Sequence, residues 1–145
     1  MDHDPQPNAR ADWGKITRHL ATNALADRLR AGAADHEPHR QAALELLIAD
    51  DHSRWLDNET FTAMCVYENN DRAYINWRGA RDAFDNGAFD KSSTTERAIL
   101  DYAIALGEDR FKFHLMDDRQ RALLAAATVR AIDPIIPAGV RLVKE

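Results

Sequence analysis

The segment FTAMCVYENNDRAYINW, residues 61–77, constrains the fold more than any other part of the chain. It is rich in aromatic and β-branched residues, and the polar triplet NND interrupts it. Residues of these types favour strands, and a short polar break between two such runs is typical of a β-hairpin. Because an isolated hairpin is only marginally stable in water, we expect this one to pack on helices or to join further strands.

The hydrophobic pattern of this segment also predicts how the two strands pair. With a two-residue loop at Asn70 and Asp71, the facing positions are Met64 with Trp77, Cys65 with Asn76, Val66 with Ile75, and Tyr67 with Tyr74. Successive side chains of a strand alternate between its two faces, so the first and third pairs form one apolar face and the tyrosines lie on the other. We therefore expect the apolar face to turn toward a helical layer, leaving the tyrosines free for other contacts.

Most of the remaining chain has the hydrophobic periodicity of amphipathic helices. Four long helices are expected over residues 12–30, 38 to about 51–55, 93–107 and 117–132, and a short one over residues 78–87. Asp12 is a candidate N-cap, Gly32 is expected to stop the first helix, and Pro38 suits the first turn of the second. The pairs with the spacing of a capping box are Ser93 with Glu96 and Asp117 with Gln120.

Two further stretches are candidate strands, residues 111–116 by alternation and residues 140–143 by their apolar character. The sequence thus predicts an α+β fold, mainly helical, in which about four α-helices pack on a small antiparallel β-hairpin or sheet. Residues 1–11 are expected to be a flexible tail and residues 12–133 a single domain. The apolar tail 134–145 is expected to dock on the domain or on a partner.

Charge and composition narrow the classes of partner. The chain of 145 residues has a net charge of −5, which disfavours general affinity for nucleic acid or for an anionic membrane. An arginine-rich C-terminal third could still form a nucleic-acid face, but acidic residues are interleaved with its arginines. No apolar run approaches the ~18 residues of a membrane span, and the N-terminus lacks the features of a signal peptide. A cytoplasmic location is the expectation.

The origin of the chain is indicated by its amino-acid composition and by one resemblance. Only 4 of the 19 basic residues are lysine, and alanine is abundant, as in proteins of a high-GC bacterium, phage or plasmid. The stretches SSTTERAILDYAIALG and DDRQRALLAAATVRAI resemble the ends of small actinobacterial proteins. This resemblance implies an origin and no function.

Three histidines are weak candidates for a metal site, namely His36, His39 and His52, each within two positions of an acidic residue. His52 lies 13 residues beyond His39, or about 20 Å along a helix at a rise of about 1.5 Å per residue, so one helix cannot bring both to one ion. The spacing of His36 and His39 also differs from the H-E-x-x-H zinc signature. Acidic residues at helix ends are ordinarily solvated, and no metal or cofactor is expected.

Candidate catalytic groups are equally sparse. Cys65 is the single cysteine, so the chain has no intramolecular disulfide, and the expected neighbours of its thiol do not favour a thiolate. No glycine-rich phosphate loop and no G-x-S-x-G elbow occurs in the sequence. Together these features disfavour a standalone enzyme.

The candidate partner-binding residues are Tyr67, Tyr74 and Arg72 on the hairpin, and Ile135, Ile136 and Leu142 on the tail. Tyrosine and arginine are enriched at interaction hot spots. The favoured function is therefore a non-catalytic protein-interaction or regulatory module that acts through an aromatic hairpin face, with a homo-oligomer as the first expectation. Two alternatives stay open: a small metal-dependent or acid–base enzyme that uses the three histidines and nearby aspartates, and a nucleic-acid-binding protein.

Overall fold

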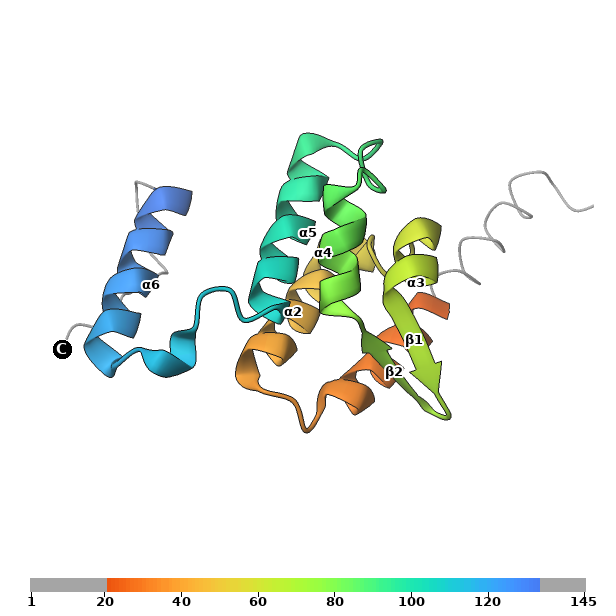
Figure 1. Cartoon of the computed structure of the whole chain (residues 1–145), viewed down its shortest axis with the longest axis horizontal. Coiled ribbons are helices and arrows are strands. Elements are labelled where there is room, and N and C mark those ends of the chain that lie inside the picture. The colour runs from red at the N-terminus through yellow and green to blue at the C-terminus, as the bar shows by residue number, and fades with distance from the viewer. Residues whose placement is uncertain (1–20, 134–145) are drawn as a thin grey trace, which may run out of the picture. The chain divides into compact units, whose positions relative to one another are not determined.

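The structure, a computed structural model, describes residues 21–133 and confirms a mainly helical α+β fold with one small antiparallel sheet (Figure 1). The elements in chain order are helical residues 21–33, α2 (Pro38–Ala49), the 3-10 turn η1 (Asp51–Ser53), α3 (Glu59–Cys65), β1 (Val66–Asn69), β2 (Arg72–Ile75), α4 (Trp77–Asp85), α5 (Thr94–Gly107), the 3-10 turn η2 (Phe113–Leu115) and α6 (Asp118–Ile132). Six α-helices are thus present in the described part, against the expected four or so.

The described residues form two compact units, 21–110 and 111–133. The prediction of a single domain over residues 12–133 is not tested by this division and stays a prediction. The predicted tails, 1–11 and 134–145, lie outside the described residues, as does the candidate strand 140–143.

The predicted hairpin is present with the predicted register. Val66 pairs with Ile75 and Tyr67 with Tyr74, and the backbone N–H of Asn76 donates to the carbonyl oxygen of Cys65 at 2.7 Å. The loop between the strands has two residues, as expected, and its first residue, Asn70, has the left-handed backbone that such turns require (φ 60°).

The strands are shorter than predicted, because residues 59–65 form helix α3. Asn58 caps this helix, since its Oδ1 accepts a hydrogen bond from the N–H of Phe61 at 2.8 Å. Phe61 and Cys65 are four residues apart and both enter the core. The pairing of Met64 with Trp77 is therefore wrong: Met64 is 55% exposed on α3, whereas Trp77 is buried as the first residue of α4.

The core of unit 21–110 lies between α2, α5 and a group of aromatic side chains. Ala43, Leu44 and Leu47 of α2 are buried where this helix packs on α5, which supplies Leu100 and Ile104. Figure 1 shows α2, α4 and α5 as neighbouring ribbons.

Aromatic rings extend this core toward α3. Trp55 meets Phe89 edge to face, with ring centroids 5.4 Å apart, and Phe61 lies 6.1 Å from both rings. Such edge-to-face pairs add stability beyond the apolar area that they bury. The second helix ends at Ala49, earlier than the predicted residues 51–55, and Trp55 lies beyond it but still forms part of the core.

The hairpin is held against helical residues 21–33 by two contacts. Gly32 packs so closely on β2 that a Cβ at this position would overlap the carbonyl oxygen of Ala73. The guanidinium of Arg28 donates to Glu68 at 2.7 Å and to the carbonyl oxygen of Asn70 at 3.2 Å. Gly32 thus allows the first helical segment to approach β2 closely. It does not stop the helix as predicted, because the helical residues continue one position beyond it.

In the second unit, residues 111–116 form no strand, contrary to the alternating pattern. Lys112 has a left-handed backbone (φ 54°), which turns the chain into the short helix η2. Helix α6 then begins as predicted, because the side chain of Asp117 accepts from the N–H of Gln120 while the Gln120 side chain accepts from the N–H of Asp117.

Candidate functional site

A cleft of about 840 Å³ opens on the surface of unit 21–110. Its walls come from the end of helical residues 21–33, the start of α2, the hairpin, the start of α4 and the end of α5. Its volume falls in the range usual for ligand-binding pockets, about 300–1,000 Å³. Two sets of residues that the sequence analysis treated as unrelated, the pair His36 and His39 and the pair Tyr67 and Tyr74, line this one cleft.

One wall of the cleft is a row of three rings. Tyr67 and Tyr74, the tyrosine pair, face each other across the two strands in a stacked arrangement, with centroids 5.2 Å apart and an interplanar angle of 21°. The ring of His36 lies 6.0 Å from that of Tyr74. Tyr67 is 54% exposed, so a large part of its ring can meet a bound group.

A hydrogen bond fixes the orientation of the His39 ring and determines which of its two nitrogens carries the hydrogen in the neutral form. Its Nδ1 lies 2.9 Å from the carbonyl oxygen of Leu106, near the end of α5. A carbonyl oxygen only accepts, so Nδ1 must carry the hydrogen, and in the neutral ring Nε2 is then a hydrogen-bond acceptor. Within residues 21–133, Nε2 has no hydrogen-bond partner.

Arg81 forms part of the cleft wall, but its charge is matched within the fold. Its guanidinium lies 2.8 Å from Asp101, 3.1 Å from Glu108 and 3.5 Å from Asp85, and only 13% of its side chain is exposed. The hydrogen bonds and charges of Asp101 and Glu108 raise its pKa despite its partial burial. Arg81 therefore ties α4 to α5 and offers little net positive charge to a ligand.

The other charged side chains of the cleft are less fully paired than Arg81. Arg40 lies 3.8 Å from Glu37, whose pKa is lowered by a hydrogen bond to its own backbone N–H and then by Arg40. Arg78 and Asp82 also line the cleft, and neither makes an ion pair with any described residue. The cleft thus mixes both signs of charge with aromatic surface.

The third histidine candidate, His52, lies elsewhere. It belongs to η1, has a left-handed backbone (φ 58°), and its side chain is 87% exposed outside the cleft. In the part of the chain that the structure describes, no group of three or more His, Cys, Asp or Glu side chains could hold a metal ion.

Cys65 lies in the core, 1% exposed, where burial raises the pKa of its thiol to about 11. A thiol with so high a pKa is almost entirely protonated at neutral pH and is a poor nucleophile. The interpretation of Cys65 as a structural thiol agrees with this environment.

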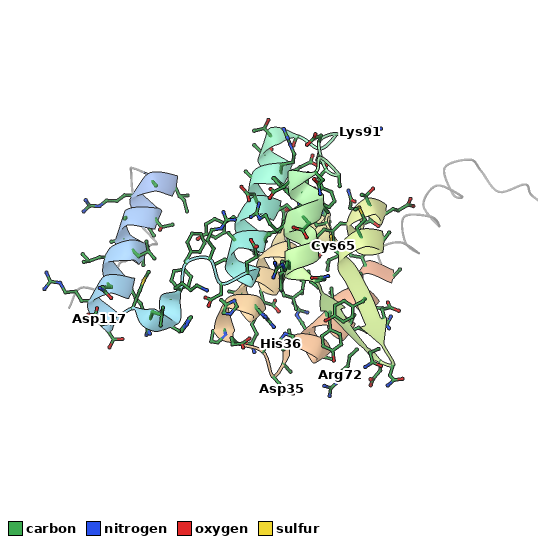
Figure 2. All side chains as sticks on the ribbon, viewed as in Figure 1. Asp35, His36, Cys65, Arg72, Lys91 and Asp117 are labelled. Carbon is green, nitrogen blue, oxygen red and sulfur yellow. The ribbon has the colours of Figure 1, made fainter. Side chains whose placement is uncertain are left out.

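The remaining partner-binding candidates divide into two groups. Arg72 is exposed at the turn end of β2 and does not line the cleft; Figure 2 labels both Arg72 and His36. Ile135, Ile136 and Leu142 lie outside the described residues. Sequence reasoning missed Arg78 and Asp82 as cleft residues, and no local pattern could have grouped them with the tyrosine pair, because the grouping depends on how α4 packs.

Comparison of the chain with models of protein families, with curated proteins and with solved structures finds no match. Within residues 21–133, no helix has both the length and the apolar character needed to span a membrane.

Proposed function

We propose that this chain is a non-catalytic binding module whose cleft receives a segment of a protein partner. The observation that carries the proposal is the stacked tyrosine pair on the wall of an 840 Å³ cleft, in which Tyr67 is exposed and Tyr74 is half-buried. Exposed aromatic side chains in a concave site with a few polar groups are the usual ingredients of a recognition surface. A second copy of the chain is the first candidate partner, and a cytoplasmic location in a high-GC host remains our prediction.

The experiment uses a photoreactive benzophenone side chain installed at position 67 of the full chain, expressed in a high-GC host. A defined adduct is expected on illumination, and it should be lost when Tyr74→Ser removes the stacked neighbour. The matched control is the same side chain at position 57, because Asp57 is exposed and does not line the cleft. Equal adduct yields from the two positions would contradict the proposal.

Light scattering on the purified chain then separates the two kinds of partner. A self-associating module gives a mass above that of one chain, 16.4 kDa, and loses it in the Tyr67→Ser, Tyr74→Ser double variant. A monomer that still forms the adduct in cells identifies a different protein as the partner. A monomer that forms no adduct contradicts the binding proposal in both forms.

A second candidate function, acid–base catalysis by His39, is favoured by one specific observation. The Nδ1 of this cleft-lining histidine donates to the Leu106 carbonyl, and its Nε2 has no hydrogen-bond partner among residues 21–133, as a general base requires. The test is hydrolysis of a panel of p-nitrophenyl esters and phosphates by the purified chain. Turnover abolished in His39→Gln, but kept in His52→Gln, would place catalysis ahead of binding.

A further inference from the structure

We propose that the cleft recognises an arginine side chain presented by the bound protein segment. This inference rests on the proposed binding function and adds to it the chemistry of the group that is bound. Three features of the cleft support it: an aromatic surface, a fixed hydrogen-bond acceptor and an acidic setting.

The aromatic surface is the ring of Tyr67. One face of this ring stacks on Tyr74, and with 54% of the residue exposed the ring remains accessible to a ligand. A guanidinium group is planar and weakly hydrated, so it stacks on aromatic rings and is attracted to their electron-rich faces. A stacked tyrosine pair is also rigid, because Gly32 and Arg28 hold the hairpin in place, and therefore loses little freedom on binding.

The polar groups of the cleft that remain available include two acceptors. In the neutral ring, Nε2 of His39 is an acceptor because Nδ1 donates to Leu106, and Asp82 supplies a carboxylate that forms no ion pair with residues 21–133. A guanidinium is the complementary group, since it has five N–H donors and no acceptor. A carboxylate ligand would instead face an acceptor nitrogen and a like charge.

The unit that contains the cleft is also acidic overall, which favours a cationic ligand. Residues 21–110 contain 17 Asp and Glu against 10 Lys and Arg. Of the arginines that line the cleft, Arg81 is matched by three carboxylates and Arg40 lies near Glu37. The positive charge of Arg78 repels a cationic ligand. Removing this charge should therefore strengthen binding of the arginine side chain, and the direction of that change can be tested.

The experiment is an NMR titration of the ¹⁵N-labelled full chain with N-acetyl-L-arginine amide. The expected result is saturable shifts of the backbone amides of Tyr67, Tyr74 and Asp82, with weaker shifts for the lysine analogue. N-acetyl-citrulline amide, which has nearly the same shape and no charge, is the control ligand and should produce no saturable shifts.

Three variants locate the site. Asp82→Asn should weaken binding by about threefold, the size expected for one solvent-exposed ion pair, and Arg78→Ala should strengthen it by a similar factor. Asp57→Asn, an exposed acid outside the cleft, should leave the affinity unchanged. Because all three side chains are exposed, none of these changes is expected to unfold the chain.

Two outcomes would overturn the inference: equal binding of the citrulline and arginine probes, or arginine binding that Asp82→Asn and Asp57→Asn weaken equally. Failure here is distinguishable from failure of the proposed function. A photo-adduct at position 67 without arginine binding would leave a binding module with a different ligand. Absence of both the photo-adduct and arginine binding would contradict the arginine inference and the proposed binding function together.

Discussion

Gly107 lies so close to Trp77 that a Cβ at this glycine would overlap the indole ring. This contact joins the last residue of α5 to the first residue of α4 at the edge of the cleft. The φ angle of Gly107 is not positive, so the backbone conformation does not require glycine here. The residue is small because the indole ring occupies the space where a side chain would lie. Both residues are buried, which leaves the ring little room to move away.

The first prediction is that Gly107→Ala destabilises the chain, although alanine is the better helix former. Helix propensity alone would favour the change by about 1 kcal/mol. Overlap with a packed ring should outweigh this gain, giving a net loss of about 1–3 kcal/mol. Urea denaturation measures the difference. Gly79→Ala is the comparison: there the added Cβ overlaps only the end of the Asn76 side chain, which can shift at the cost of its hydrogen bond to the Gly79 N–H, so a smaller loss is expected. A Gly107→Ala variant as stable as the parent would contradict the packing described here.

The second prediction concerns the pH dependence contributed by Cys65. Its thiol ionises near pH 9 in the unfolded chain and near pH 11 in the fold, because burial disfavours the thiolate. The unfolded state therefore gains stability from ionisation as the pH rises through this window, and the folded chain loses about 1.4 kcal/mol per pH unit. Below pH 9 the thiol contributes no slope.

The measurement is the free energy of unfolding between pH 8 and pH 11 for the parent and for Cys65→Ala. All other titratable side chains are the same in the two chains, so the difference between the two curves isolates the thiol. Parallel curves would show that Cys65 is not shielded from water. A thiol-specific reagent such as iodoacetamide should also react with the folded parent far more slowly than with the denatured chain.

The third prediction is that Asn76→Ala weakens the start of α4. The Oδ1 of Asn76 accepts from the N–H of Gly79 at 2.9 Å, so the change leaves that donor without its partner. Loss of such an N-cap typically costs about 1 kcal/mol. Asn76→Asp keeps the acceptor and should retain most of the stability. Thermal unfolding of the two variants distinguishes a capping role from simple loss of a polar side chain.

The fourth prediction is that Arg81→Lys destabilises the chain even though it preserves the charge. The guanidinium reaches Asp101 and Glu108 at once, and a single ammonium group cannot reproduce that forked geometry. We expect a loss of about 1–2 kcal/mol, because the guanidinium itself is mostly shielded from solvent while Asp101 is half-exposed. Arg110→Lys is the matched control, since Arg110 is exposed and lies 3.6 Å from Glu108. Equal effects in the two variants would contradict the role assigned to Arg81.

The sequence predicted the hairpin's register because that register depends on local chemistry. A two-residue turn allows one alignment of its flanking residues, and the observed pairs Val66 with Ile75 and Tyr67 with Tyr74 follow from it. The predicted strands were too long because the apolar residues of segment 61–65 are compatible with both the two-residue repeat of a strand and the 3.6-residue repeat of a helix. The four-residue spacing of Phe61 and Cys65 suits a helix, and Asn58 supplies an N-cap signal that is visible in the sequence.

The cleft was less predictable than the fold, because it is assembled from residues far apart in the chain. His39 acquires its orientation from Leu106, 67 positions away, and no periodicity connects the two. The tyrosine pair was identified as available surface, but its position beside His36 depends on how the hairpin packs on helical residues 21–33. Local patterns thus identified the ingredients of the site, and only tertiary packing brought them together.

The two-residue turn at Asn70 has a consequence for natural variation. Side chains alternate between the faces of a strand, so one residue inserted within a strand, between Tyr67 and Asn69 or between Arg72 and Tyr74, would send one of the two rings to the other side of the sheet. Such an insertion would dismantle the ring stack while leaving every tyrosine, histidine and arginine in the sequence. In related chains, the number of residues from each tyrosine to the turn should therefore report the integrity of the cleft better than the presence of the tyrosines alone.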